Sequence, residues 1–189
     1  MSERLVGASV LPLMIDPLHG TLYFLLAKER YHPSWPEGSG LWTDFGGKQE
    51  PGECAETVAA REFVEESLGQ VPFSEEQSPE PIAIAQALKQ GHYILQFTHL
   101  QSGTRFVTFV VHVPWDPGAP ARFTKARRAQ SATHLPEKCQ LGLFSSVQVL
   151  DATQCKGFLV PERERAAHHL TDALSVILPE LQFHFPHLF

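Results

Sequence analysis

The sequence predicts a protein of the α/β (α+β) class, folded as a single domain over residues 1–189. Segments rich in β-branched and aromatic residues alternate with segments whose apolar residues recur at helical spacing. A chain of 189 residues is long enough to bury one sizeable core and short for two domains of usual size. With 43% apolar and 19% charged residues, the composition is that of a globular protein rather than a disordered one.

Two apolar runs near the N-terminus predict a β-hairpin. They cover residues 5–15 and 21–27, and the turn-prone sequence Asp-Pro-Leu-His-Gly separates them. Residues 82–100 and 104–113 are also rich in aromatic and β-branched residues, with a Gln-Ser-Gly turn between them. We expect all four segments to pair in one main sheet.

Helical spacing is clearest in residues 53–68, where alanine, valine and phenylalanine share one face and acidic residues lie on another. Gly69 is the expected stop, because glycine readily takes the left-handed conformation that ends helices. A second helix is expected over residues 161–177, which begin with a proline. Residues 29–40 and 114–136 are expected to be long irregular loops.

The charge and the cysteines restrict partners and location. A formal charge of −6 argues against a long polyanion as the main partner, since nonspecific nucleic-acid binding depends on many Lys and Arg contacts. The three cysteines lack a CxxC spacing, which favours a reducing compartment without a disulfide framework or zinc site. No apolar run is long enough for a membrane span. The expected location is cytoplasmic, with nucleus and organelles open.

Three glutamates form the most informative cluster. Residues three and four apart share a helix face, so Glu62 lies on the same side as both Glu65 and Glu66. At about 6 Å, each like-charged pair costs on the order of 2–3 kcal/mol unless a cation is bound. Mg²⁺ prefers oxygen ligands and often bridges carboxylates to phosphates. The double glycine before this helix lets the backbone approach closely, and the Gly47 carbonyl could add an oxygen. The pattern therefore predicts metal-assisted phosphate chemistry.

The residues of this region resemble the Nudix box. Its pattern is glycine, five residues, glutamate, seven residues, then Arg-Glu-apolar-x-Glu-Glu, and it is matched by Gly47, Glu53, Arg61, Glu62, Phe63, Glu65 and Glu66. The resemblance implies a Nudix-like α/β/α sandwich with a mixed central sheet. It also implies that Glu62, Glu65, Glu66 and the Gly47 carbonyl bind Mg²⁺ or Mn²⁺, while Glu53 and Arg61 form a structural pair between loop and helix.

The sequence departs from the family pattern at two positions. The usual glycine two residues after the last glutamate is replaced by Leu68, so the helix is expected to end one residue late, at Gly69. Phe45 replaces the usual proline before the double glycine. Both changes leave the spacing of the glutamates intact.

The implied activity is hydrolysis of a diphosphate linkage in a nucleoside-diphosphate-linked compound, by attack of water at phosphorus. Glu66 or Glu65 is the expected base, with Glu137 and Asp151 as alternatives from later segments. The substrate is a small nucleotide-type molecule, and an RNA cap and a homodimer both stay open. The rival interpretation is a Nudix-fold module that binds a nucleotide-like ligand without hydrolysing it; keeping all three glutamates argues against it.

Several side chains near the box are candidates for substrate contact. Arg30 and Lys48 flank the first long loop and the double glycine, where a cation could meet a phosphate. Trp42, Tyr31 and Trp35 could stack on a base, although aromatic residues beside strands are more often core. Substrate choice is expected to depend on the loops at residues 31–42 and 114–136.

Overall fold

The structure is a computed structural model that describes residues 3–34, 36–75, 80–131, 136–154, 158–159 and 164–188. In chain order, its elements are β1 (Arg4–Ile15), β2 (Leu22–Glu29), β3 (Trp42–Thr43), β4 (Phe45–Lys48), α1 (Ala55–Ser67), α2 (Pro81–Lys89), β5 (Leu95–Gln101), β6 (Thr104–His112), α3 (Ala119–Arg128), β7 (Lys138–Ser145), α4 (Ser146–Gln154), β8 (Phe158–Leu159), β9 (Glu164–Arg165), α5 (His168–His184) and the 3-10 turn η1 (Pro186–Leu188). Among these described helices, none is long and apolar enough to cross a membrane.

The long strand β1 organises a mixed sheet. It pairs antiparallel with β2, with Leu13 opposite Phe24, which confirms the predicted hairpin. It pairs parallel with β6, which in turn pairs antiparallel with β5, while β7 pairs antiparallel with the other edge of β2. The mixed sheet expected from the resemblance is therefore present.

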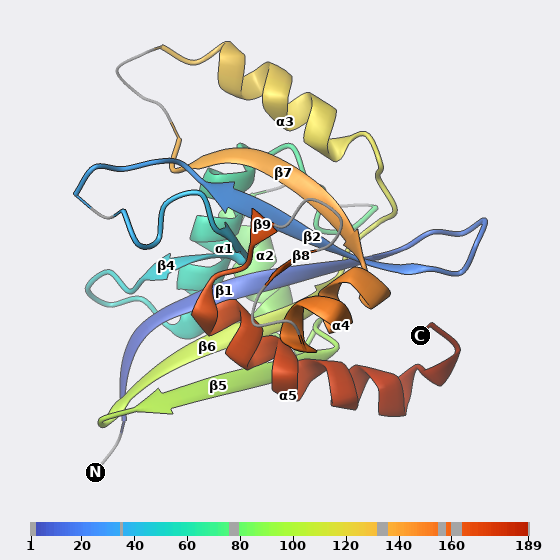
Figure 1. The fold of residues 1–189 in the computed structure, drawn as a ribbon. Coiled ribbons are helices and arrows are strands. Elements are labelled where there is room, and N and C mark those ends of the chain that lie inside the picture. The colour runs from blue at the N-terminus through green and yellow to red at the C-terminus, as the bar shows by residue number, and fades with distance from the viewer. Residues whose placement is uncertain are drawn as a thin grey trace.

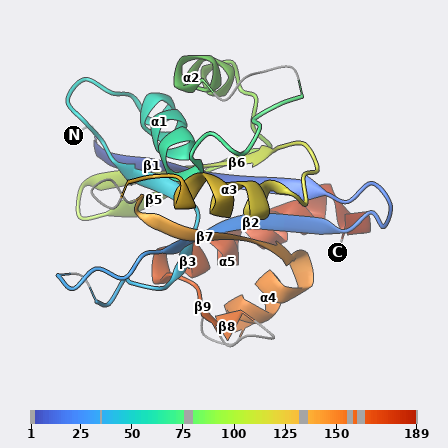
Figure 2. The same cartoon turned by 90° about the horizontal axis from the view of Figure 1, so that it is seen from above.

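Helices cover both faces of the sheet. Figures 1 and 2 show α1 and α2 on one face and α4 and α5 on the other. One apolar core lies under α1 and α2 and includes Phe45 and Phe63, whose rings meet edge to face at 5.4 Å. The other lies under α4 and α5 and contains Trp42, which packs edge to face on Phe144 at 4.8 Å. The α/β/α sandwich is confirmed.

The segment from β3 to β4 enters the sheet where β1 and β2 separate. Thr43 pairs with Ala27 of β2, and Gly46 then pairs with Ser9 of β1. Buried Phe45 packs on Phe63 and so holds this segment against α1. The double glycine is thereby placed directly beside the predicted carboxylate helix.

Three predicted elements are corrected. The first half of residues 82–100 is not a strand but α2, because Ile84, Ala87 and Leu88 form a buried helical stripe after a proline in the first turn. The predicted irregular stretch 114–136 contains α3, which also has a proline in its first turn, Pro120, and packs on β7. The second predicted helix begins later, as α5; residues 161–163, where its start was expected, lie outside the described residues.

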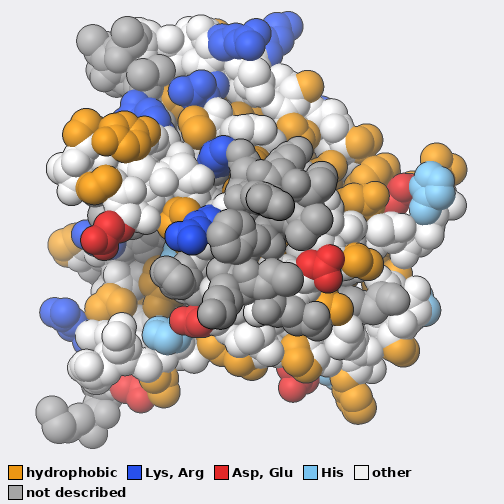
Figure 3. Space-filling view, viewed as in Figure 1, with side chains coloured by type: hydrophobic (Ala, Val, Ile, Leu, Met, Phe, Trp, Pro, Cys, Tyr) orange, Lys and Arg blue, Asp and Glu red, His pale blue; other side chains and the backbone are white. Residues whose placement is uncertain are grey.

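The basic residues of α3 have a structural explanation. Lys125, Arg127 and Arg128 occupy its last turn, where positive charge interacts favourably with the helix dipole. Figure 3 shows Lys and Arg side chains gathered at the top of this face, over α3.

The end of α1 also differs from the expectation. The helix ends at Ser67, and Leu68 itself takes the left-handed conformation with φ 54°. The Gly69 amide then donates to the Val64 carbonyl at 2.9 Å, as in a Schellman motif. The helix therefore keeps the family register, with a leucine in strained backbone where glycine is usual.

We expect Leu68→Gly to be more stable than Leu68→Ala by about 1 kcal/mol, because the left-handed conformation costs a residue with a Cβ about 1–2 kcal/mol. Both variants lose the leucine side chain, so the comparison isolates the backbone. Val64→Gly and Val64→Ala, inside α1, provide the control, where alanine should be the more stable by about 1 kcal/mol. Urea unfolding measures all four. If the alanine variant were the more stable at position 68 as well as at position 64, the backbone at Leu68 would not be strained.

Candidate functional site

A cavity of about 910 Å³ lies between α1 and the β4–α1 loop, and its lining is mostly polar. It is lined by Glu29, Gly46, Gly47, Lys48, Gln49, Glu50, Arg61, Glu62, Glu65, Glu66, Pro136 and Glu137. The structure thus brings most of the predicted site residues to one cavity.

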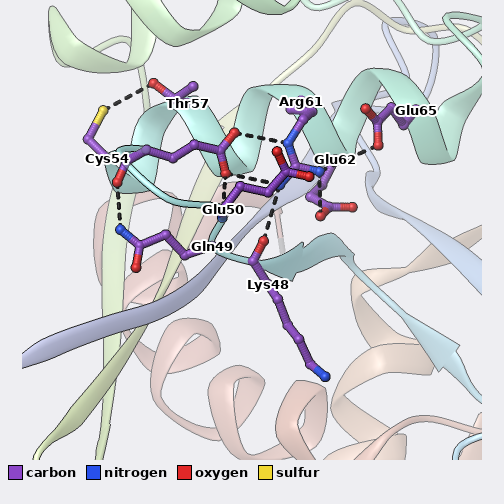
Figure 4. A network of polar contacts seen from close by, with 9 residues as sticks. Lys48, Gln49, Glu50, Cys54, Thr57, Arg61, Glu62 and Glu65 are labelled. Atoms are coloured by element: carbon purple, nitrogen blue, oxygen red, sulfur yellow. Dashed lines mark hydrogen bonds and ion pairs between the residues drawn. The ribbon is translucent and has the colours of Figure 1, made fainter.

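Arg61 clamps the loop that precedes α1 (Figure 4). Its Nε and a terminal nitrogen donate to the two carboxylate oxygens of Glu53 at 2.9 and 3.1 Å, and the latter nitrogen also donates to the Lys48 carbonyl at 3.1 Å. The hydrogen bonds from Arg61 hold the pKa of the Glu53 carboxyl below its usual value. This two-point contact fixes the loop against the helix.

Glu62 and Glu65 also contact Arg61 through its other terminal nitrogen. Glu62 accepts a hydrogen bond at 2.8 Å, whereas Glu65 is 3.5 Å away and 59% exposed. Partial burial raises the pKa of Glu62, against the lowering effect of Arg61. Glu65 is therefore the freest of the three glutamates.

Glu66 points into the protein and is only 5% exposed. One of its oxygens lies 3.0 Å from the Lys138 ammonium, and the other accepts a hydrogen bond from the Gly46 amide at 2.8 Å. Burial raises the pKa of the Glu66 carboxyl well above its usual value, although Lys138 opposes this. Each glutamate thus has a basic partner, and no three Asp, Glu, His or Cys side chains of the described residues form a ready metal-binding group.

Lys138 is the functional candidate that the sequence reasoning missed. It begins β7, and its ammonium pairs with Glu29 and donates to the Thr43 hydroxyl at 2.9 Å. Its partners lie on β2, β3 and α1. A single lysine ahead of an apolar run carries no signal that could have placed it here.

The double glycine allows close contact on both sides. A Cβ on Gly46 would meet the side chain of Ser9 and lie 2.8 Å from the Ala8 carbonyl oxygen. A Cβ on Gly47 would instead meet the Glu62 carboxylate, 2.5 Å from its Cδ. Gly46 therefore serves the strand pairing, and Gly47 leaves room for Glu62.

A second cavity, of about 400 Å³, shares Glu29 and Gly46 with the first. Its remaining lining is Val6, Thr43, Asp44, Phe97, His99, Gln101, Thr104, Phe106, Thr108, Lys138, His169 and Ala173. Buried Asp44 accepts a hydrogen bond from the Ser9 hydroxyl at 2.6 Å and lies 3.5 Å from Nε2 of His169. This cavity is largely apolar, with a polar end beside the first.

The other predicted contact residues lie in varied places. Lys48 is exposed and lines the first cavity, as does Glu137. Trp42 is 1% exposed in the core and lines neither cavity, so stacking on a base is corrected to packing on Phe144. Arg30 is half-buried and lines neither cavity, and its amide donates to the Glu137 carbonyl at 2.8 Å.

The last three residues predicted for base stacking or proton transfer lie away from these two cavities or outside the described residues. Tyr31 is 67% exposed and lines neither of them. Asp151 lies on α4 and is absent from both linings. Trp35 lies outside the described residues.

Glu53→Gln tests the clamp through its pH dependence. Because the folded-state pKa of Glu53 is lowered, its stabilisation is complete above the unfolded pKa of about 4.3 and is lost as the pH falls through the folded value. We expect the unfolding free energy of wild type to exceed that of Glu53→Gln by about 1 kcal/mol at pH 7. This value allows for the charged hydrogen bonds and for their screening by solvent. This difference should shrink toward pH 3 in denaturant unfolding. A difference that does not change with pH would contradict the pairing.

Comparison with known proteins supports the fold. No protein-family model and no curated protein matches the sequence. Among solved structures, the chain is similar to the Nudix hydrolase RenU of M. smegmatis, with 14% identity over 98% of this chain and 91% of that one and a TM-score of 0.52. A mutT/nudix family protein of Listeria innocua shows 20% identity over 97% and 99% of the two chains, with a TM-score of 0.46.

A C. elegans Ap4A hydrolase shows 15% identity over 92% of this chain and 97% of that one, with a TM-score of 0.45. The likeness to RenU extends over nearly the whole of both chains and concerns the architecture, since the identity is low. The chain therefore has the fold of the Nudix superfamily.

Proposed function

We propose that this protein is a metal-dependent hydrolase that cleaves a diphosphate linkage in a nucleoside-diphosphate-linked compound. The observation that carries the proposal is the cavity in which three glutamates of α1, a glycine backbone and an Arg-clamped loop meet. A fold shared with Nudix hydrolases adds to it. Water is the attacking group and phosphorus the centre attacked.

The cavity offers oxygen ligands to a divalent cation, which would compete with Arg61 and Lys138 for the glutamates because the described side chains hold no preformed metal-binding group. Its donors are carboxylate and carbonyl oxygens, which Mg²⁺ and Mn²⁺ prefer. The missing side chain of Gly47 leaves the space in which the Glu62 carboxylate lies. We propose Glu62, Glu65, Glu66 and the Gly47 carbonyl as the ligands. When bound, the cation supplies Lewis acidity that stabilises negative charge on the phosphates.

The protein's own groups would divide the remaining work. Lys48 is exposed at the cavity wall, where its ammonium can attract a phosphate. Glu53 and Arg61 hold the loop. Glu65 is the better placed base, because both oxygens of Glu66 already have partners while Glu65 has one contact at 3.5 Å. We therefore propose Glu65 as the group that takes the proton from water.

The organic part of the substrate would extend into the second cavity. The two cavities are neighbours, since Glu29 and Gly46 line both, and a molecule bound at the glutamates would reach the second cavity past the wall that separates them. The apolar wall of the second cavity suits a flat ring, and its polar end suits hydrogen-bonding groups. These properties support a nucleoside as one of the two groups joined by the diphosphate.

A panel of dinucleoside polyphosphates, nucleotide sugars, capped RNA and oxidised nucleotides tests the proposal, with phosphate and nucleotide release measured in Mg²⁺, in Mn²⁺ and in EDTA. We expect turnover of at least one compound, abolished by EDTA. The alternative is a module that binds without hydrolysis. Nucleotide binding by calorimetry with no turnover on the whole panel would favour that alternative and overturn the proposal.

A further inference from the structure

Lys138 is a buried cation surrounded by oxygens of three elements. Its ammonium pairs with Glu29 at the end of β2, lies 3.0 Å from a Glu66 oxygen of α1, and donates to the Thr43 hydroxyl of β3 at 2.9 Å. The Lys138 side chain is 2% exposed, and those of Glu66 and Glu29 are 5% and 14% exposed. One ammonium thus serves two carboxylates, of which Glu66 is buried and Glu29 is half-buried.

This group forms part of the wall between the two cavities. Glu66 lines the first cavity, Lys138 and Thr43 line the second, and Glu29 lines both. Lys138 holds one Glu66 oxygen, and the Gly46 amide holds the other. The orientation of the Glu66 carboxylate is therefore fixed from two sides without any bound ion.

Stability alone is a poor reason for such a lysine. Burying an ion pair costs desolvation that its attraction seldom exceeds, and well-packed apolar residues often serve the fold equally well. Two carboxylates that share a single ammonium have a different consequence, because they favour a further cation in the first cavity, which Glu29 and Glu66 both line. Lys138 then keeps the Glu66 carboxylate in position, and the two carboxylates still attract a cation because they share only one ammonium.

We propose that Lys138 is a positioning residue that acts as a built-in cation. It holds Glu66 at the cavity wall and supplies permanently a charge that a bound metal would otherwise have to supply. The proposal rests on the metal-dependent function proposed above. It follows that protein without this lysine depends more strongly on a divalent ion for its stability, because the ion replaces the missing ammonium.

Lys138→Met tests this inference, because methionine is close to lysine in side-chain length and carries no charge. The melting temperature is measured with and without Mn²⁺, for wild type, Lys138→Met and Lys138→Met/Glu66→Gln. Lys125→Met, which removes an exposed lysine of α3, is the matched control. Steady-state kinetics on the compound found in the panel complete the set.

We expect Mn²⁺ to raise the melting temperature of Lys138→Met at least twice as much as that of wild type. The excess should disappear in Lys138→Met/Glu66→Gln, where the unpaired carboxylate is gone. We also expect kcat to fall about tenfold or more with KM little changed, since misplacing a catalytic group costs rate rather than binding. Lys125→Met should match wild type in its kinetics and in the change of melting temperature that Mn²⁺ causes.

A lysine that is only structural would lower the melting temperature equally with and without Mn²⁺. An Mn²⁺ effect in Lys138→Met no larger than in wild type, or failure of this variant to fold even in Mn²⁺, overturns the inference and leaves the proposed hydrolase standing. Absence of both turnover and an Mn²⁺ effect in wild type would instead overturn the proposed function, and this inference with it.

Discussion

Glu65→Gln should lower kcat by about 10²–10⁴-fold, the usual contribution of a general base. Glutamine keeps the size of the side chain and removes its ability to take a proton. The fold should not change, because Glu65 is 59% exposed and its contact with Arg61 is long at 3.5 Å. We therefore expect a melting temperature close to that of wild type together with a large loss of turnover at saturating substrate.

Glu56→Gln is the matched control, since it makes the same change on the same helix outside the cavity lining. It should keep wild-type kinetics. Turnover by Glu65→Gln within tenfold of wild type would exclude Glu65 as the base. Parallel measurements on Glu66→Gln and Glu137→Gln would then show which of these two carboxylates takes the proton.

Local patterns predicted the parts of the fold that local interactions determine. The hairpin of β1 and β2 follows from two apolar runs around a turn, and α1 follows from helical spacing. Short apolar runs are ambiguous between strand and helix, and this is why the isoleucines and alanines of α2 also fit the pattern of a strand. Pro120 in the first turn of α3 favours a loop when read alone, although proline also suits the first turn of a helix.

The candidate site likewise combines residues that their spacing predicts with residues that only the folded sheet brings together. Glu62, Glu65 and Glu66 lie on one helix, so their spacing alone placed them together, and all three line one cavity. Lys138 could not be found in this way, because its partners come from distant segments that only the folded sheet brings together. The paired state of Glu66 also depends on that lysine. Sequence spacing therefore predicts which acids share a face but not which charges oppose them.

Alanine at Gly46 should lower the stability of the fold, whereas alanine at Gly47 should lower activity. Gly46→Ala places a Cβ against Ser9 and 2.8 Å from the Ala8 carbonyl oxygen, within paired strands that cannot move apart cheaply. We expect a loss of about 3 kcal/mol or more in unfolding free energy, at the upper end of overpacking costs. The nearest atoms to a Cβ at Gly47→Ala are those of the Glu62 carboxylate, which can rotate away.

Gly47→Ala should therefore stay folded, with an unfolding free energy within about 1 kcal/mol of wild type. Its kcat/KM should fall about 10²-fold, because a displacement near 1 Å of a site group has that effect. Urea unfolding and kinetics on both variants separate the two roles. If Gly47→Ala kept full activity, the position of Glu62 against the glycine backbone would not matter for the reaction. If Gly46→Ala were as stable as wild type, the close approach of β4 to β1 at Gly46 would not contribute to the stability of the fold.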